Sequence, residues 1–390
     1  MMRLVNTYNE NTLYIKENSI DKKCYMCGSL NIVNGVCADC NNDGSTIYYV
    51  ERPIKYHKHT VYYEFSLSNE QKEASQFFLN HLKNKSNAFL YAVCGSGKTE
   101  IMYESILYAL NNKMKVLITI PRKEIVKELY GRLKRIFKET KITFIDGANH
   151  DDSGELLLST VNQLIHYEDE FDLIILDEAD AYPYAGNDYL HRLVIKSLKK
   201  DGVLFLMSAT KKEHIPYDTF TIKKRYHNHE LSMPNFIKCD MKNMAKSSAF
   251  LKLLLDERKH IIYVPTIKYA KELSSLLSIE YISSKSKDQD KLIKMLKNGS
   301  VKNIISTTIL ERGITIKDVD VIVLEAQDKV FTHQTLIQIC GRVGRSYDDP
   351  YGSIYLFYRK NSLKFFIVRR YIKRMNSWDA QFVKKNYIST

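Results

Sequence analysis

The clearest pattern in the first half of the chain is a series of short apolar runs separated by amphipathic stretches. One such stretch, Lys123 to Phe137, repeats its apolar residues at helical spacing and predicts a helix. Near-continuous Val, Ile and Leu runs that alternate with helices are typical of a parallel sheet buried on both faces. The runs that we expect to form its strands are AFLYAV (88–93), KVLITI (115–120), ITFI (142–145), ELLLST (155–160), FDLIILDEAD (171–180) and GVLFLMSAT (202–210).

The pattern breaks over residues 211–248, which are polar and rich in His and Lys, and then resumes. The later runs are HIIYVP (260–265), KNIISTT (302–308), VDVIVLEA (319–326) and GSIYLFY (352–358). They predict a second α/β domain. We therefore expect an N-terminal module (1–62), a first α/β domain (63–225), a linker (226–248), a second α/β domain (249–362) and a basic aromatic tail (363–390).

Composition narrows the class of protein. The 390 residues are 44% hydrophobic, which is enough for two sizeable cores, and the formal net charge is +13. A charge of this size attracts polyanions such as nucleic acid or an anionic membrane surface. No run reaches the roughly 18 apolar residues of a membrane span, and the first residues have no apolar signal core. We expect a cytoplasmic protein that meets the inner face of the membrane only peripherally, through partners.

Four of the seven cysteines fall in two C-x-x-C pairs, Cys24 with Cys27 and Cys37 with Cys40. This spacing matches a tetrahedral four-thiolate zinc site, and the alternative is a pair of disulfides. Because we expect a cytosolic protein, whose thiols are kept reduced, zinc is favoured over disulfides. Four thiolates leave no open position on the metal, so the site is expected to be structural.

The stretch YAVCGSGKTE (91–100) has the composition of a phosphate-binding loop. Gly95 and Gly97 allow the backbone N–H groups to turn inward at φ values that other residues avoid. Lys98 would then reach the β- and γ-phosphates of a nucleotide and Thr99 would bind Mg²⁺. Ala92 stands where the full motif has its first Gly, so an ordinary strand–turn–helix corner is the alternative.

Further polar residues follow later apolar runs. In LDEAD, Asp177 is placed to hold Mg²⁺ and Glu178 to orient or deprotonate the attacking water. Ser208 to Thr210 (SAT) end the next run and are candidates for linking these acids to the domain junction. In QICGRVGR (338–345), Arg342 and Arg345 would point at a γ-phosphate and stabilise transition-state charge.

The stretch from Arg359 to Lys385, which includes most of the tail, combines basic and aromatic residues, a mixture that suits single-stranded nucleic acid. A helix that packs its aromatics inward explains the pattern equally well. The basic residues are Arg359, Lys360, Lys364, Arg369, Arg370, Lys373, Arg374, Lys384 and Lys385, and the aromatics are Phe365, Phe366, Tyr371 and Trp378.

Taken in order, these segments resemble the motifs of superfamily 2 helicases and translocases. The series is SLSNEQ with Gln71, AVCGSGKT, IPRKE, STVNQL, DEAD, SAT, TTILERG and QICGRVGR, over roughly residues 65–346. Within that superfamily, AVCGSGKTE, LDEADAYPY, RYHNHELSMP and the N-terminal cysteines resemble the late competence protein ComFA family, which is associated with uptake of single-stranded DNA. Replication-restart helicases share the ATPase motifs, but their zinc-binding cysteines interrupt the second motor domain.

The resemblance implies two RecA-like domains in tandem and an ATPase that uses ATP, Mg²⁺ and Zn²⁺. It implies that Gln71 contacts the adenine and that the phosphates and Mg²⁺ are held by Gly95, Ser96, Gly97, Lys98 and Thr99. Asp177 would supply the metal contact and Glu178 the catalytic base. From the second domain, Gly313 and Gln338 would line the nucleotide, and Arg342 and Arg345 would be arginine fingers. Pro121-Arg122, Ser159-Thr160 and Thr307-Thr308 would contact a nucleic-acid backbone.

The implied partners are single-stranded DNA and a competence DNA-uptake channel with its accessory proteins, and a homo-oligomer stays open. Two departures from the family patterns matter. The last motif begins with Gln338, where RNA helicases of the DEAD group usually have His, and Glu311 stands where many relatives have Ala or Asp. The main expectation is a single-stranded DNA motor for DNA import. The alternatives are a repair or replication-restart helicase, an RNA helicase, and a nucleic-acid-binding scaffold with weak ATPase.

Overall fold

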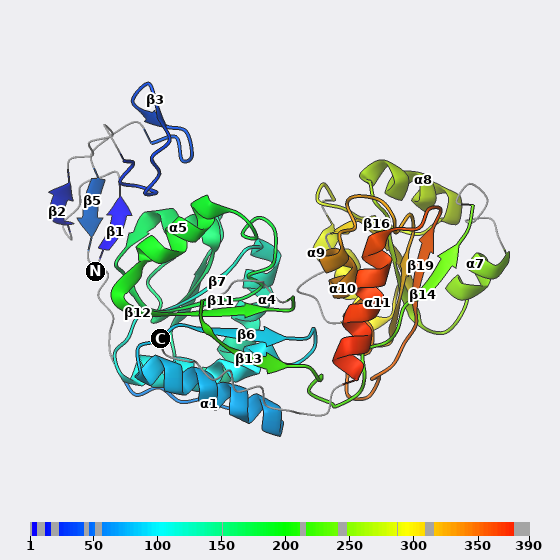
Figure 1. Cartoon of the computed structure of the whole chain (residues 1–390), viewed down its shortest axis with the longest axis horizontal. Coiled ribbons are helices and arrows are strands. Elements are labelled where there is room, and N and C mark those ends of the chain that lie inside the picture. The colour runs from blue at the N-terminus through cyan, green and yellow to red at the C-terminus, as the bar shows by residue number, and fades with distance from the viewer. Residues whose placement is uncertain are drawn as a thin grey trace, which may run out of the picture. The chain divides into compact units, whose positions relative to one another are not determined.

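The computed structural model describes residues 2–5, 12–16, 23–42, 47–50, 57–149, 151–210, 216–240, 248–286, 288–308 and 316–377 (Figure 1). The chain divides into two compact units. The first comprises Met1–Ala92 and Gly97–Ile222, and the second comprises Val93–Ser96 and Lys223–Thr390. Each unit is built on its own parallel sheet.

The first unit contains a seven-stranded sheet in the order β13-β6-β12-β11-β7-β9-β8, and every neighbouring pair in it is parallel. Three interior strands, β6, β7 and β9, are buried along their whole length, as expected for a sheet covered on both faces. The predicted α/β class is confirmed. The strands are β6 (Ala88–Ala92), β7 (Val116–Ile120), β8 (Ile142–Ile145), β9 (Leu156–Thr160), β11 (Phe171–Leu176), β12 (Leu198–Ser208) and β13 (Asp218–Ile222).

Helices of the first unit supply the rest of its core, in which Phe78 stacks on Phe205 of β12. They are α1 (Asn69–Lys83), α2 (Lys98–Ile101), α3 (Tyr103–Asn111), α4 (Lys123–Ile136), α5 (Asp188–Ser197) and the 3₁₀ helix η1 (Val161–His166). The start of α1 is fixed by a capping box between Ser68 and Gln71. Because this box places Gln71 in the first turn, the local sequence positions one of the predicted site residues.

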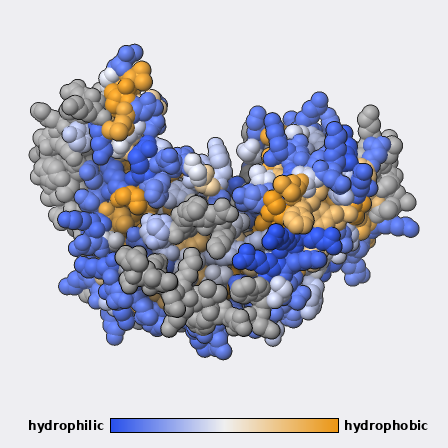
Figure 2. Space-filling model, viewed as in Figure 1, coloured by the Kyte–Doolittle hydropathy of each residue, from blue (hydrophilic) through white to orange (hydrophobic). Residues whose placement is uncertain are grey.

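The N-terminal segment adds two small sheets. β1 (Met2–Val5), β2 (Thr12–Lys16) and β5 (Ile47–Val50) join β10 (Tyr167–Glu168) in an antiparallel sheet of order β10-β1-β5-β2. The hairpin of β3 (Ile32–Val33) and β4 (Val36–Cys37) turns at Asn34 and Gly35, which both have positive φ. Figure 2 shows an apolar patch over β3, where Leu30 and Val33 are exposed.

The second unit contains a six-stranded parallel sheet in the order β14-β19-β18-β15-β17-β16. It confirms the second predicted α/β domain. Its strands are β14 (Asn235–Lys238), β15 (Lys259–Tyr263), β16 (Tyr281–Ile282), β17 (Asn303–Ser306), β18 (Val319–Val323) and β19 (Ile354–Tyr358). Its helices are α7 (Ser248–Leu254), α8 (Ile267–Leu277), α9 (Gln289–Asn298), α10 (His333–Cys340) and α11 (Leu363–Asn376).

Two segments are more ordered than their polar sequences suggest. The stretch 226–248, expected to be a linker, contributes β14 to the edge of the second sheet. The described part of the basic tail forms α11, in which Phe365, Val368 and Ile372 are buried whereas Phe366 is exposed. Most of the apolar side of α11 therefore packs inward. Within the described residues, no helix combines the length and the hydropathy that crossing a membrane would need.

Candidate functional site

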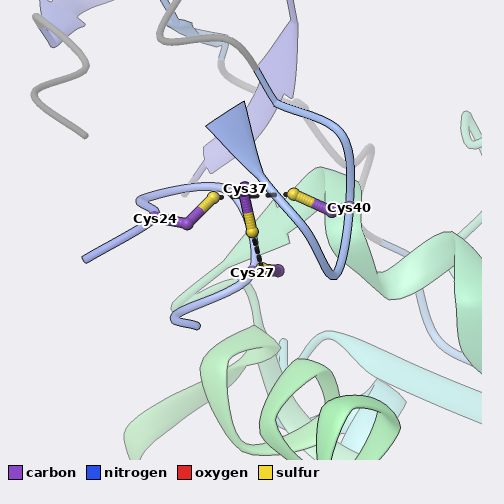
Figure 3. Close-up of side chains that lie close together, drawn as sticks. All are labelled: Cys24, Cys27, Cys37 and Cys40. Carbon is purple, nitrogen blue, oxygen red and sulfur yellow. Dashed lines mark hydrogen bonds between the residues drawn. The ribbon is translucent and has the colours of Figure 1, made fainter. Parts of the chain in front are cut away.

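The four cysteines of the N-terminal module converge on one point (Figure 3). The Sγ atoms of Cys24 and Cys40 are 3.5 Å apart, and those of Cys27 and Cys37 are 3.6 Å apart. A disulfide would require about 2.05 Å, so the cysteines are free thiols in this arrangement. Zinc bound at about 2.3 Å to four tetrahedral sulfurs places them about 3.8 Å apart. The cluster therefore fits a zinc ion.

Local backbone geometry and electrostatics also suit a metal at this point. The first knuckle closes through a hydrogen bond from Gly28 N to Cys24 O (2.7 Å), and Gly28 has a positive φ of 71°. In the second knuckle the same position is taken by Asn41, with φ of 57°. Burial raises the pKa of Cys40 to about 12 and also raises the pKa of Cys27. A bound cation would favour the thiolate forms of Cys27 and Cys40.

The cysteine module is anchored to α5 of the first unit. Lys196 Nζ donates to Met26 O at 2.5 Å and to Ile165 O at 3.2 Å, and Arg192 pairs with Asp39 at 2.7 Å. Burial lowers the pKa of Lys196 to about 8. Sequence reasoning missed both basic residues because nothing in an amphipathic helix indicates which exposed position meets a distant module.

The loop between β6 and α2 has the backbone that the glycine pattern predicts. Gly95 and Gly97 have φ values of 84° and 75°, in the left-handed region that favours glycine. A Cβ at Gly97 would overlap the side-chain amide of Gln71, which is 4% exposed. Gln71 Oε1 in turn accepts from Ser68 N at 2.8 Å. The structure thus brings Gln71 directly against the phosphate-loop glycine.

The acidic pair lies at the carboxyl end of β11, in the same unit as Lys98. Asp177 is 9% exposed, and its Oδ1 accepts from Glu178 N at 2.7 Å. Burial raises the pKa of Asp177 to about 6, while the Lys98 ammonium lowers it and Glu178 raises it. Burial thus disfavours the charged form of Asp177, and a divalent cation bound beside it would offset that cost. Lys98 Nζ donates to Ala92 O at 3.4 Å.

A residue that the sequence did not single out holds the other proposed Mg²⁺ ligand. Arg132 of α4 donates from Nη1 to Thr99 Oγ1 at 3.3 Å and pairs with Glu100. Thr99 and Glu100 are both nearly buried. This contact fixes the first turn of α2 from a neighbouring helix, and no local motif could have revealed it.

The SAT segment is linked to the acidic strand end. Thr210 Oγ1 donates to Asp180 Oδ2 at 2.8 Å, and Thr210 N donates to Ser208 Oγ at 3.0 Å. The backbone joins the same two segments, because Ala179 N donates to Met207 O. The hydroxyl residues are therefore hydrogen-bonded to the acidic segment at Asp180, and their expected role in linking Asp177 and Glu178 to the domain junction stays a prediction.

In the second unit the motif QICGRVGR spans the end of α10 and the following turn. Gln338 and Arg342 are almost fully buried, and Arg345 Nε donates to Gly341 O at 2.7 Å. Gly344 has a φ of 65°, and a Cβ there would collide with Pro350 O. Gly313, predicted to line the nucleotide, lies outside the described residues, as does Glu311.

The turn that carries Arg345 is clamped by side chains from the segment after β13. Arg225 Nη1 donates to Val343 O at 2.6 Å and Gly344 O at 2.5 Å, and His227 Nε2 donates to Gly344 O at 3.0 Å. These residues belong to the stretch RYHNHELSMP, whose family resemblance was visible without indicating a role. Ser96 is 1% exposed, and its N donates to Val93 O.

The loops expected to contact nucleic acid differ in accessibility. Arg122, Thr307 and Thr308 are half-buried and so reach solvent. Ser159 is fully buried, and its hydroxyl donates to Thr119 Oγ1 at 3.4 Å. The expectation that Ser159 contacts a nucleic-acid backbone is wrong here, because its hydroxyl is buried and joins β9 to β7 instead.

Known proteins share both halves of this architecture. Residues 64–213 match the family model "Type III restriction enzyme, res subunit", and residues 245–347 match "Helicase conserved C-terminal domain". Competence protein ComFA of Bacillus subtilis is 30% identical over 339 residues, covering 81% of this chain and 73% of that protein. ComFA of Streptococcus pneumoniae is 29% identical over 374 residues, covering 89% and 85%.

A solved structure shows the same fold. A variant of Dbp5 of S. cerevisiae bound to RNA and ADP BeF3 aligns with a TM-score of 0.60 and 18% identity, over 80% of this chain and 93% of that chain. The two family models and the ComFA relatives identify the two α/β units as the tandem domains of a superfamily 2 helicase ATPase. The chain belongs to the ComFA family within that superfamily.

Proposed function

We propose that this protein is an ATP-driven motor that moves along single-stranded DNA and draws transforming DNA into the cytoplasm. The observation that carries the proposal is the similarity to two competence proteins over most of both chains. The coarser activity, an ATPase with superfamily 2 helicase domains, follows from the family models. The substrate strand, the import role and partners at an uptake channel belong to the proposal.

The proposed chemistry assigns a task to each residue near the phosphate loop. Lys98 and the loop amides hold the phosphates of ATP, while Thr99 and Asp177 would hold Mg²⁺, which neutralises phosphate charge when bound. Glu178 orients the attacking water and accepts its proton. The buried position of Asp177 and its electrostatic interaction with Lys98 support this assignment. Arg342 and Arg345 of the second unit act on the charge that develops at the γ-phosphate.

Hydrolysis becomes motion if the nucleotide state changes how tightly the chain holds one position of the strand. The hydrogen bond from Thr210 to Asp180 supports this step, since it ties the SAT segment to the strand end that carries Asp177. A change at the γ-phosphate would thereby reach a second segment of the same unit. Each ATP cycle would then advance the strand by a short step.

The grip on the strand is proposed to be electrostatic and independent of sequence. The net charge of +13 favours a polyanion, and Arg122 lies in a partly exposed loop at the carboxyl end of β7. Thr307 and Thr308 occupy the matching loop after β17 in the second unit. Hydroxyl and guanidinium groups of this kind bind phosphates without reading bases.

The deciding experiment measures steady-state ATP hydrolysis by the purified chain with no nucleic acid, single-stranded DNA, duplex DNA and single-stranded RNA. Lys98→Ala serves as the inactive blank. Lys85→Ala is the matched control, because Lys85 lies in the same unit and its side chain forms an exposed pair with Asp201. We expect strong stimulation by single-stranded DNA alone in the parent and in Lys85→Ala, and none in Lys98→Ala.

A second measurement separates movement from binding. The rate of hydrolysis on single strands of increasing length is expected to rise with length for a translocating motor and to stay flat for a static binder. Equal stimulation by RNA would instead support an RNA helicase. The absence of stimulation by any strand would leave the scaffold alternative.

A further inference from the structure

Two histidines and a glutamate meet at the point where the chain leaves the N-terminal module. The cluster consists of His57, His59 and Glu155, and one ligand-type atom of each lies within 4.8 Å of the others. His59 and Glu155 are buried, and the His57 side chain is 44% exposed. The two imidazole rings lie 4.3 Å apart between centroids. This cluster is separate from the four cysteines and from the phosphate loop.

The hydrogen bonds of His57 leave a cation-binding atom facing a carboxylate. His57 Nε2 lies 2.9 Å from Glu139 O, and a carbonyl only accepts, so Nε2 carries the hydrogen. His57 Nδ1 lies 3.2 Å from Glu155 Oε1. In the neutral imidazole this places two electron pairs against each other, so either a second proton or a metal ion must lie between them.

The distance between His57 and Glu155 is compatible with a shared metal ion. Ligands bound to tetrahedral zinc at about 2.0–2.1 Å lie about 3.3 Å apart, close to the 3.2 Å observed between His57 Nδ1 and Glu155 Oε1. Two imidazoles and one carboxylate form a ligand set that zinc accepts, with a fourth position left for water.

The outer partners of the cluster are those that metal-binding side chains use. His59 Nδ1 lies 2.9 Å from Thr140 Oγ1, and Glu155 Oε2 accepts from Lys141 N at 2.9 Å. Asn111 of α3 bonds both His59 N and His59 O. Such partners orient the rings and the carboxylate before a metal arrives.

A second cluster in the same protein shows that three ligand-type side chains close together do not by themselves make a metal site. Asp256, His260 and Asp320 also lie within 4.8 Å of one another, but Arg258 pairs with Asp320 and already supplies the positive charge. Among the described residues, no lysine or arginine pairs with Glu155. The His57 cluster therefore retains an anionic carboxylate that lacks a permanent cationic partner there.

We propose that His57, His59 and Glu155 form a second zinc site, which fastens the segment following the four-cysteine module to the first unit. The site joins that segment to Glu155 just before β9, next to the α4–β8 turn, where Thr60 and Tyr62 also donate to Glu139. The same segment continues to Ser68 and Gln71 at the phosphate loop. Zinc at this point holds the chain between the module and the nucleotide site.

The test is the number of zinc ions bound by the full-length chain, titrated with Zn²⁺ against a competing chelator of moderate affinity. The parent is expected to bind two zinc ions, one tightly and one that competes with the chelator. His57→Gln and Glu155→Gln should each lose the weaker one and keep the tighter one. Both variants are expected to fold, because His57 is partly exposed and a glutamine amide oxygen can still accept from Lys141 N.

Matched variants make the result specific. His81→Gln is the control, because His81 also faces a carboxylate, Asp218 at 3.8 Å, but belongs to no cluster of three ligands. That absence of a cluster around His81 holds for the residues that the structure describes, and the variant should keep both zinc ions. Thr140→Val, which removes only the hydroxyl behind His59, should weaken the second site by about 10- to 100-fold. One zinc ion in the parent, two in both ligand variants, or an equal loss in His81→Gln would overturn the proposal.

Discussion

The contact between Gln71 and Gly97 yields the sharpest prediction of this structure. Replacing Gly97 by alanine adds a Cβ that overlaps the Gln71 amide and lies 3.0 Å from Glu100 Oε2. The residue also sits at a φ of 75°, which an L-residue adopts only with strain. Gln71 cannot simply swing away, because its Oε1 is held by Ser68 N at 2.8 Å in the capping box of α1.

The two effects can be estimated separately. The left-handed backbone costs about 1–2 kcal/mol for an L-residue. Displacing Gln71 breaks its hydrogen bond to Ser68, which contributes about 0.5–1.5 kcal/mol, and adds local repacking, so the clash contributes about 1–2 kcal/mol more. The total for Gly97→Ala is therefore about 2–4 kcal/mol, or a lowering of the melting temperature of this unit by about 4–16 °C.

The matched control is Gly186→Ala. Gly186 has a nearly equal φ of 72°, but a Cβ there meets nothing within 4 Å, so this variant carries only the backbone cost. Melting temperatures are measured calorimetrically without nucleotide, so that loss of ATP binding does not contribute. Adding Gln71→Ala to Gly97→Ala should recover the clash energy, which a double-mutant cycle isolates. Equal shifts for Gly97→Ala and Gly186→Ala, or additive effects in the cycle, would refute the proposed contact.

Three further changes test the remaining parts of the site. Arg345→Ala should leave ATP affinity nearly unchanged and lower the turnover number by about 10³-fold, as measured by nucleotide binding and single-turnover hydrolysis. The control Arg369→Ala, on the exposed side of α11, should change neither quantity. Unchanged turnover in Arg345→Ala would remove Arg345 from the finger role. Thr210→Val should lower the movement along DNA per ATP hydrolysed by about tenfold, because its hydrogen bond to the Asp180 carboxylate contributes about 1.5–3 kcal/mol. The control Thr219→Val removes a hydroxyl that bonds only a backbone oxygen in the described structure, and it should leave this movement unchanged. Replacing all four clustered cysteines by serine should remove the tightly bound zinc and weaken DNA binding, because a metal contributes much of the folding energy of so small a module. Basal ATP hydrolysis should persist. Normal DNA binding by this variant would make the module dispensable.

The fold was largely predictable because its signals are local and repeated. Uninterrupted apolar runs such as 115–120 and 171–176 became fully or largely buried parallel strands, since they are too short for a typical buried helix and are rich in β-branched residues. The polar stretch 226–248 was expected to be a linker, but it contains β14. This strand lies at the edge of the sheet, so its burial pattern is mixed and its sequence resembles a loop. The basic tail was ambiguous for a related reason, since α11 carries basic and apolar residues on different sides.

The sequence by itself determined the residues whose chemistry depends on near neighbours along the chain. The two C-x-x-C pairs, the glycines with positive φ at 95 and 97, and the acids that end β11 all follow from spacing. Their position is dictated by a few adjacent backbone dihedrals, which short motifs encode directly. Even the convergence of the four cysteines is a short-range matter.

Only the tertiary structure decided which distant side chains complete these sites. Arg132 reaches Thr99 from another helix, Arg225 clamps the turn before Arg345, and Glu155 meets His57 across the first unit. These partners lie on elements whose own periodicity is satisfied without them, so no local pattern marks them. Their roles arise from the order in which parallel strands associate, which depends on the packing of the whole sheet and not on any single segment.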